Sequence, residues 1–109
     1  MTTIDPQSAI ETMWRLAPEY AQAKAHRLYL EEYSRVLRAR LMKGYPDLSV
    51  SAQEREAFAD PKYEEHLKGL QASIEVEEKL RWRLTSAQTA VEVWRTQQAS
   101  NRMIEKATA

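Results

Sequence analysis

The sequence predicts an all-α protein, a long antiparallel helical hairpin that resembles a coiled coil and assembles as a dimer or higher oligomer. Only two of the 109 residues are glycines, and the good helix formers Ala, Glu, Arg, Leu and Gln are abundant. Apolar residues recur at spacings of three and four, which places them on one face of a helix. A stretch rich in turn signals separates two such regions. We expect one domain over residues 1–109, with helices at 6–17, 18–43, 51–59 and 61–106.

The composition narrows the functional classes. With 43% hydrophobic and 29% charged residues, the chain resembles an ordinary soluble protein. It contains no cysteine, which excludes disulfides, thiolate zinc sites and cysteine nucleophiles. Its first residues lack the basic start and apolar run of a secretion signal, and no apolar run is long enough to span a bilayer. We therefore expect a cytoplasmic protein that does not contact a membrane.

A proline separates the first two helices. Asp5 can cap free N–H groups and Pro6 suits the first helical position, so a helix starts here. Pro18 cannot donate a hydrogen bond to the carbonyl of Trp14, so it kinks or ends this helix, and we place a short helix before it. The expected apolar face consists of Ala9, Ile10, Met13, Trp14, Ala17, Ala21, Ala25, Leu28, Leu30, Tyr33, Val36, Leu37 and Leu41. The opposite side carries Lys24, Arg27, Glu31, Arg35 and Arg38.

Turn and cap signals place the connector and the last helix. Gly44 is a typical C-terminal stop, and Pro46 continues the chain as a turn. Residues 51–54, Ser-Ala-Gln-Glu, have the spacing of a capping box, which predicts the short helix of the connector. Asp60 and Pro61 then start a helix of 46 residues, about 69 Å long at the usual rise of ~1.5 Å per residue.

The long helix carries an imperfect heptad seam. Its apolar members are Leu70, Leu80, Leu84, Ala87, Val91 and Trp94. Ser73 and Glu77 occupy two seam positions, so the seam is weak in its middle. A neighbouring stripe is formed by Tyr63, Leu67 and Ile74.

If the chain reverses between Lys43 and Pro61, the two long helices pair in a definite register. The predicted pairs are Leu37 with Leu67, Leu30 with Ile74, Ala25 with Leu80, Ala21 with Leu84, Trp14 with Val91 and Ile10 with Trp94. Small residues then face large ones, as in well-filled cores. Two helices alone leave much apolar surface wet, so we predict a homo-oligomer, most simply a four-helix dimer.

No residue pattern indicates catalysis, a metal or a cofactor. His26 and His66 lack the Glu-x-x-His and His-x-x-x-His spacings of metal sites, and we interpret both as surface histidines. The only glycines, Gly44 and Gly69, form no phosphate-binding loop. The carboxylates Glu64, Glu65, Glu75, Glu77 and Glu78 are interpreted as an acidic solvated face. We therefore expect a protein that is not an enzyme.

The most informative stretch is Arg81-Trp82-Arg83. Arg81, Gln88, Arg95 and Arg102 recur every seven residues and line one side of the helix. One interpretation is a phosphate-binding stripe with Trp82 stacked on a base. The other, which we favour, is the flank of a dimer interface, where arginine stems cover apolar surface and meet carboxylates. The tryptophans, Trp94 included, are more typical of packing or interface anchors than of ligand platforms.

Four segments resemble small helical proteins of tailed bacteriophages and prophages: residues 29–33, 59–63, 80–82 and, above all, 92–102. Such proteins are often encoded among replication and recombination functions, so the resemblance implies an accessory role in DNA metabolism within the host cytoplasm. Thr96, Ser100 and Asn101 are mediocre helix formers, which suggests a specific contact for this ending. The candidate interaction residues are Arg81, Trp82, Arg83, Trp94, Arg95, Asn101 and Arg102.

Three hypotheses follow. The first is a non-enzymatic adaptor for phage DNA replication or recombination that acts through an unidentified protein partner. The second is direct binding of nucleic acid by the arginine and tryptophan side chains. The third is inhibition of a host enzyme or defence system through the acidic middle of the chain, since residues 47–80 carry a net negative charge although the whole chain is neutral.

Overall fold

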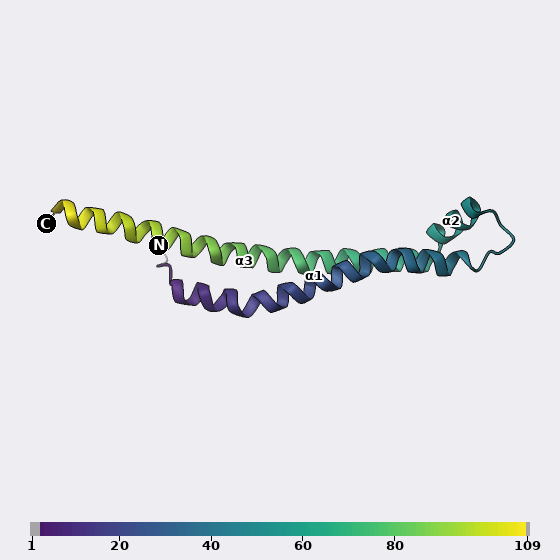
Figure 1. The fold of residues 1–109 in the computed structure, drawn as a ribbon, viewed down its shortest axis with the longest axis horizontal. Helices are drawn as coiled ribbons and strands as arrows, with labels where there is room; N and C mark the ends of the chain where they lie inside the picture. The colour runs from purple at the N-terminus through teal and green to yellow at the C-terminus, as the bar shows by residue number, and fades with distance from the viewer. Residues whose placement is uncertain (1–2, 109) are drawn as a thin grey trace. The chain divides into compact units, whose positions relative to one another are not determined.

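The computed structural model describes residues 3–108 and is built from three helices. These are α1 (Pro6–Met42), α2 (Val50–Ala59) and α3 (Pro61–Thr108), and the described residues contain no strand (Figure 1). The predicted all-α class and the helical hairpin are thus confirmed. None of these helices has an apolar stretch of the length and hydropathy that crossing a membrane requires.

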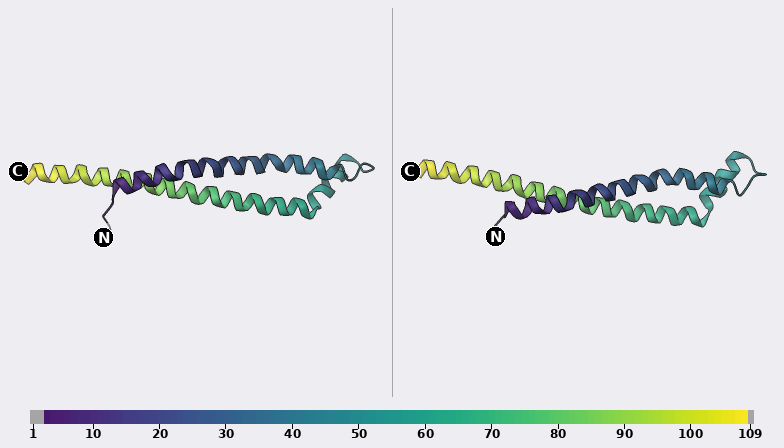
Figure 2. Two further views of the ribbon diagram at one scale, coloured as in Figure 1. Left: turned by 90° about the horizontal axis from the view of Figure 1, so that it is seen from below. Right: turned by 60° about the horizontal axis from the view of Figure 1, so that its bottom comes forward.

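The helices pair in two compact units. The first contains α1 up to Ala21 together with α3 from Lys79 onward, and the second contains residues Gln22–Glu78, including α2. Within each unit a segment of α1 lies beside a segment of α3 that runs in the opposite direction (Figure 2). The single domain expected over residues 1–109 stays a prediction.

A single helix, α1, replaces the two helices predicted at 6–17 and 18–43. The backbone N–H of Gln7 donates to Asp5 Oδ1 at 3.1 Å, which confirms the expected cap. Pro18 lies inside the helix and is exposed, and the helical backbone continues on both sides of it. The separate short N-terminal helix was therefore a wrong prediction. Nearby Leu16 is almost completely buried, and we infer that this packing offsets the hydrogen bond that a proline removes.

Local hydrogen bonds build the connector. The N–H of Gly44 donates to the Leu41 carbonyl at 3.1 Å and closes the last turn of α1. Ser49 caps α2, because its Oγ accepts from the N–H of Ala52 at 3.3 Å, so α2 starts slightly earlier than predicted. The Gln53 amide donates to the carbonyls of Tyr45 at 2.8 Å and Leu48 at 3.2 Å, which holds the loop against α2. Asp60 Oδ1 accepts from the N–H of Lys62 at 2.8 Å and starts α3 as expected.

The predicted seam of α3 is its buried side. All seam positions from Leu70 to Trp94 are buried or half-buried, including Ser73 and Glu77, each 6% exposed. In the neighbouring stripe, Tyr63 is half-buried, while Leu67 and Ile74 are 45% and 40% exposed. Their pairing with Leu37 and Leu30 stays a prediction.

The contacts between α1 and α3 in the second unit agree with the predicted register to within about one helical turn. Arg27 lies level with Glu77, as in the predicted register, whereas the contact of Ser34 with His66 at 2.7 Å is offset from it by four residues.

Only part of the predicted apolar face of α1 faces inward. Ala21 and Ala25 are exposed and Trp14 is 70% exposed, so their predicted pairing with Leu84, Leu80 and Val91 is wrong. Met13, Leu30, Leu37 and Leu41 turn inward as predicted, and five further side chains join them: Leu16, Tyr20, Ala23, Arg27 and Ser34. Several of these side chains are polar or small, so hydropathy alone did not predict that they face inward. The pairing of Ile10 with Trp94, both half-buried, stays a prediction.

Candidate functional site

The end of α3 is exposed on all sides. Every residue from Arg95 to Thr108 is exposed, and Met103 and Ile104 are 71% and 61% exposed. The apolar seam ends at half-buried Trp94, and the next positions at seam spacing are Gln98 and Asn101. The apolar face of α3 thus ends where α1 no longer covers the helix. Residues with high helix propensity continue beyond that point, so the helix itself does not end there.

The seven candidate interaction residues all lie on α3 in the first unit. Six of them are exposed, and Trp94 is half-buried at the end of the seam as a packing residue. The guanidinium carbon of Arg81 lies 5.1 Å from the ring centroid of Trp82. Trp82 is 59% exposed, so a large part of this indole is in contact with solvent. The pair is an exposed cation–π arrangement.

The predicted stripe with a seven-residue repeat is exposed throughout. Arg81, Gln88, Arg95 and Arg102 are all exposed, and the drift over seven residues is only about 20° per repeat. Part of the unusual composition of this segment has a local reason. The Thr96 hydroxyl donates to the Glu92 carbonyl at 3.1 Å, a bond that lets threonine satisfy its hydroxyl within the helix. Ser100 and Asn101 are exposed, and the structure gives no such reason for them.

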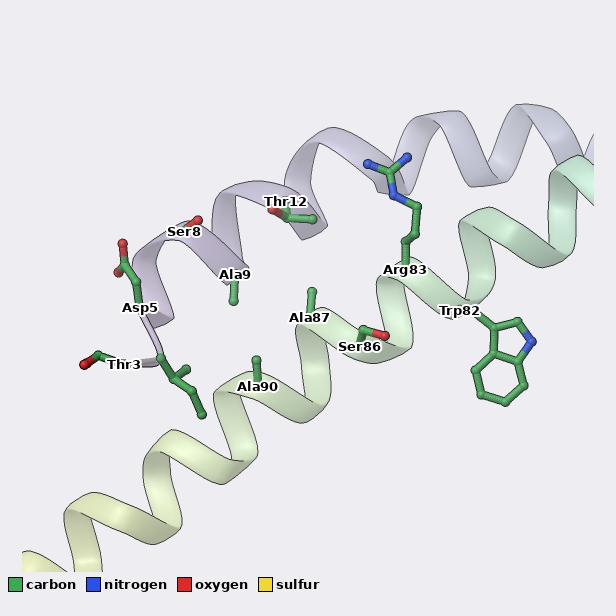
Figure 3. A pocket seen from close by; sticks show the side chains of 11 residues that line it. Thr3, Asp5, Ser8, Ala9, Thr12, Trp82, Arg83, Ser86, Ala87 and Ala90 are labelled. Atoms are coloured by element: carbon green, nitrogen blue, oxygen red, sulfur yellow. The ribbon is translucent and has the colours of Figure 1, made fainter. Parts of the chain in front are cut away.

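A groove between α1 and α3 was missed by sequence reasoning. It has a volume of about 610 Å³, and Ala9 of α1 points toward Ala87 and Ala90 of α3 (Figure 3). Other small side chains of its lining are Ser8, Thr12 and Ser86. In a sequence, small residues within a helix do not by themselves indicate a groove. Their gathering on two facing helices could have been the signal, because it leaves space between backbones.

The second unit has a polar layer in its core. Arg27 Nε donates to Glu77 Oε2, and Arg27 Nη2 donates to Glu77 Oε1 at 3.0 Å. Arg27 Nη1 also donates to Glu31 at 3.0 Å. Hydrogen bonds to Glu77 and then to Glu31 raise the pKa of Arg27 above its ordinary value. The placement of Glu77 on the solvated acidic face and of Arg27 on the solvent side was therefore wrong.

Small neighbours give this ion pair room. Ala23 and Ser73 line a shallow groove together with Gly69 and Ala72. Because these side chains are short, the long Arg27 side chain can lie between the helices and reach Glu77. Breaking a buried pair is costly, whereas an intact one adds little stability and mainly specifies register. We interpret the layer as a register device.

His66 belongs to the same core and is not a surface histidine. Its ring lies 5.6 Å from that of Tyr33 and 6.3 Å from that of Tyr63. Ser34 Oγ lies 3.3 Å from the Leu30 carbonyl oxygen and 2.7 Å from Nε2 of His66, and the single hydroxyl proton can be donated to either of them. His26, in contrast, is exposed as predicted.

The chain matches no known family model, and no curated protein or solved structure is significantly similar to it. The resemblance to phage proteins therefore stays a prediction.

Proposed function

We propose that this chain is a non-enzymatic adaptor that self-associates and contacts a protein partner through the exposed part of α3. The observation that supports this proposal most is the complete exposure of Arg95–Thr108. An uncovered helix of this length is marginal in water by itself, and a binding partner would supply the missing burial. The arginines on one side, Arg95 and Arg102, can form bidentate hydrogen bonds with carboxylates of a partner.

The resemblance to phage proteins extends the proposal. From it we propose a role for the adaptor in phage DNA replication or recombination, in the cytoplasm of a bacterial host. This part rests on segments such as residues 92–102 and on no contact in the structure.

Paired baits test the proposal. Wild-type chain is immobilised beside the double variant Arg95→Glu/Arg102→Glu and the control Arg35→Glu, which reverses an exposed arginine on α1. From a lysate of the bacterial host, we expect one stoichiometric protein on the wild type and the control that is absent from the double variant. Identical protein sets on all three baits would contradict the proposal.

A second candidate function is binding of single-stranded nucleic acid. The exposed Trp82 ring beside the Arg81 guanidinium favours it, because base stacking and phosphate attraction would meet at one place. Anisotropy of a labelled 20-nucleotide strand tests this function at about 20 mM and 200 mM salt. We expect Trp82→Ala to weaken binding about fivefold or more. Trp14→Ala, which removes a tryptophan of α1 that is even more exposed, should have no effect. No anisotropy change at low salt would dispose of this candidate.

A further inference from the structure

The exposed part of α3 has two unlike sides. The charged residues beyond Ser86 are Glu92, Arg95, Arg102, Glu105 and Lys106, and helical geometry places them all on one side of α3. The other side carries Ser86, Ala90, Val93, Gln97, Ser100 and Ile104 at alternating spacings of four and three. No residue on this uncharged side is charged from Ser86 to Thr108. Loss of charge is typical of the centre of a protein interface.

The uncharged side changes character along its length. Its first part, with Ser86 and Ala90, lines the groove of about 610 Å³ between α1 and α3. Its second part ends in Ile104, a branched side chain that is 61% exposed and has no covering helix. One face of α3 thus borders a hollow at one end and carries a protruding isoleucine at the other. The hollow is lined mainly by small side chains, together with Ile4, Asp5, Trp82 and Arg83.

We propose that a second copy of this chain covers this face by antiparallel pairing of the two α3 helices. Centred between Val93 and Gln97, the pairing brings Ile104 of each copy to Ser86 and Ala90 of the other. The same patch serves both copies, as in a two-fold dimer. This inference rests on the self-association in the proposed function and names its surface.

Two observations favour antiparallel pairing of two copies through this face. The hollow and the isoleucine are complementary to each other, so the face is complementary to itself only when one helix is reversed. A parallel pairing would place Arg83 against Arg83 of the second copy, and like charges there repel. The antiparallel pairing places Arg83 level with uncharged Ala107. The basic stripe of Arg95 and Arg102 lies on the opposite side of α3 and stays open to another partner.

Single substitutions test the surface. Light scattering after gel filtration should show a dimer for the wild type at micromolar concentration. Ile104→Glu should weaken dimerisation at least about a hundredfold, because each dimer buries the new charge twice. Gln98→Glu, with the same charge change on the opposite side of the helix, should remain dimeric. A thermal melt checks the fold, which Ile104 does not support because it is exposed.

Cysteine cross-linking tests the orientation, since the chain has no native cysteine. Ser86→Cys and Ile104→Cys should form a disulfide when the two variants are mixed and oxidised. Self-linking of Ser86→Cys alone, or no link in the mixture, would overturn the antiparallel pairing. A dimer that persists in Ile104→Glu would overturn this surface and leave self-association standing. A monomeric wild type would overturn both.

Discussion

At the scale of single residues, Leu16 is the most completely buried large side chain. It is the one large side chain that is less than 2% exposed among the described residues. We expect Leu16→Ala to lower the free energy of unfolding by about 2–5 kcal/mol, because it removes buried methyl groups and leaves a cavity. Leu28→Ala on the same helix should cost well under half as much, since Leu28 is 45% exposed. Urea denaturation measures both, and equal costs would contradict the burial pattern.

A second prediction concerns how the ion pair between Arg27 and Glu77 affects stability. Glu77→Ala leaves the half-buried guanidinium without its main acceptor, so we expect the thermal midpoint to fall by at least about 5 °C. The double variant Arg27→Leu/Glu77→Leu should recover this loss, because no charge is then left in the core. Circular dichroism melts measure both variants. A double variant less stable than Glu77→Ala would show that the pair contributes net stability.

At the scale of elements, the proline in α1 is the clearest test. Pro18 lies inside a continuous helix and lacks one backbone hydrogen bond. We expect Pro18→Ala to raise the free energy of unfolding by about 1–3 kcal/mol, since alanine restores the donor and suits the helix. Chemical denaturation measures the change. A loss of stability would mean that the packing of Leu16 requires the geometry of the proline.

The helices could be predicted better than their contacts. The Asp-Pro pairs at 5–6 and 60–61 mark two helix starts, and the seam through Ser73 and Glu77 is the buried side of α3. The inward stripe of α1 could not be read from hydropathy, because Arg27 and Ser34 lie on it while Trp14 lies outside. The predicted register agrees with the Arg27–Glu77 contact and differs by four residues from the Ser34–His66 contact. For the candidate site, sequence periodicity located the basic stripe, whereas the groove depends on the pairing of two helices.

At the scale of the whole molecule, the charge of α3 separates two roles. The side with Arg95 and Arg102 is available for a partner, and the uncharged side with Val93 and Ile104 is available for a second copy. The second unit contains the polar layer and α2, which fix the register of the hairpin there. This division would explain how a small, neutral chain can both assemble and bind.

Hydrogen exchange of the intact chain, followed over a range of protein concentrations, tests the central claim most directly. In dilute solution we expect the amides of residues 95–108 to exchange quickly, because each of these residues is exposed. At higher concentration they should become protected together with residues 86–94, while protection of residues 27–34 stays constant. Exchange of residues 95–108 that is independent of concentration would contradict the claim that this exposed segment is the surface for association.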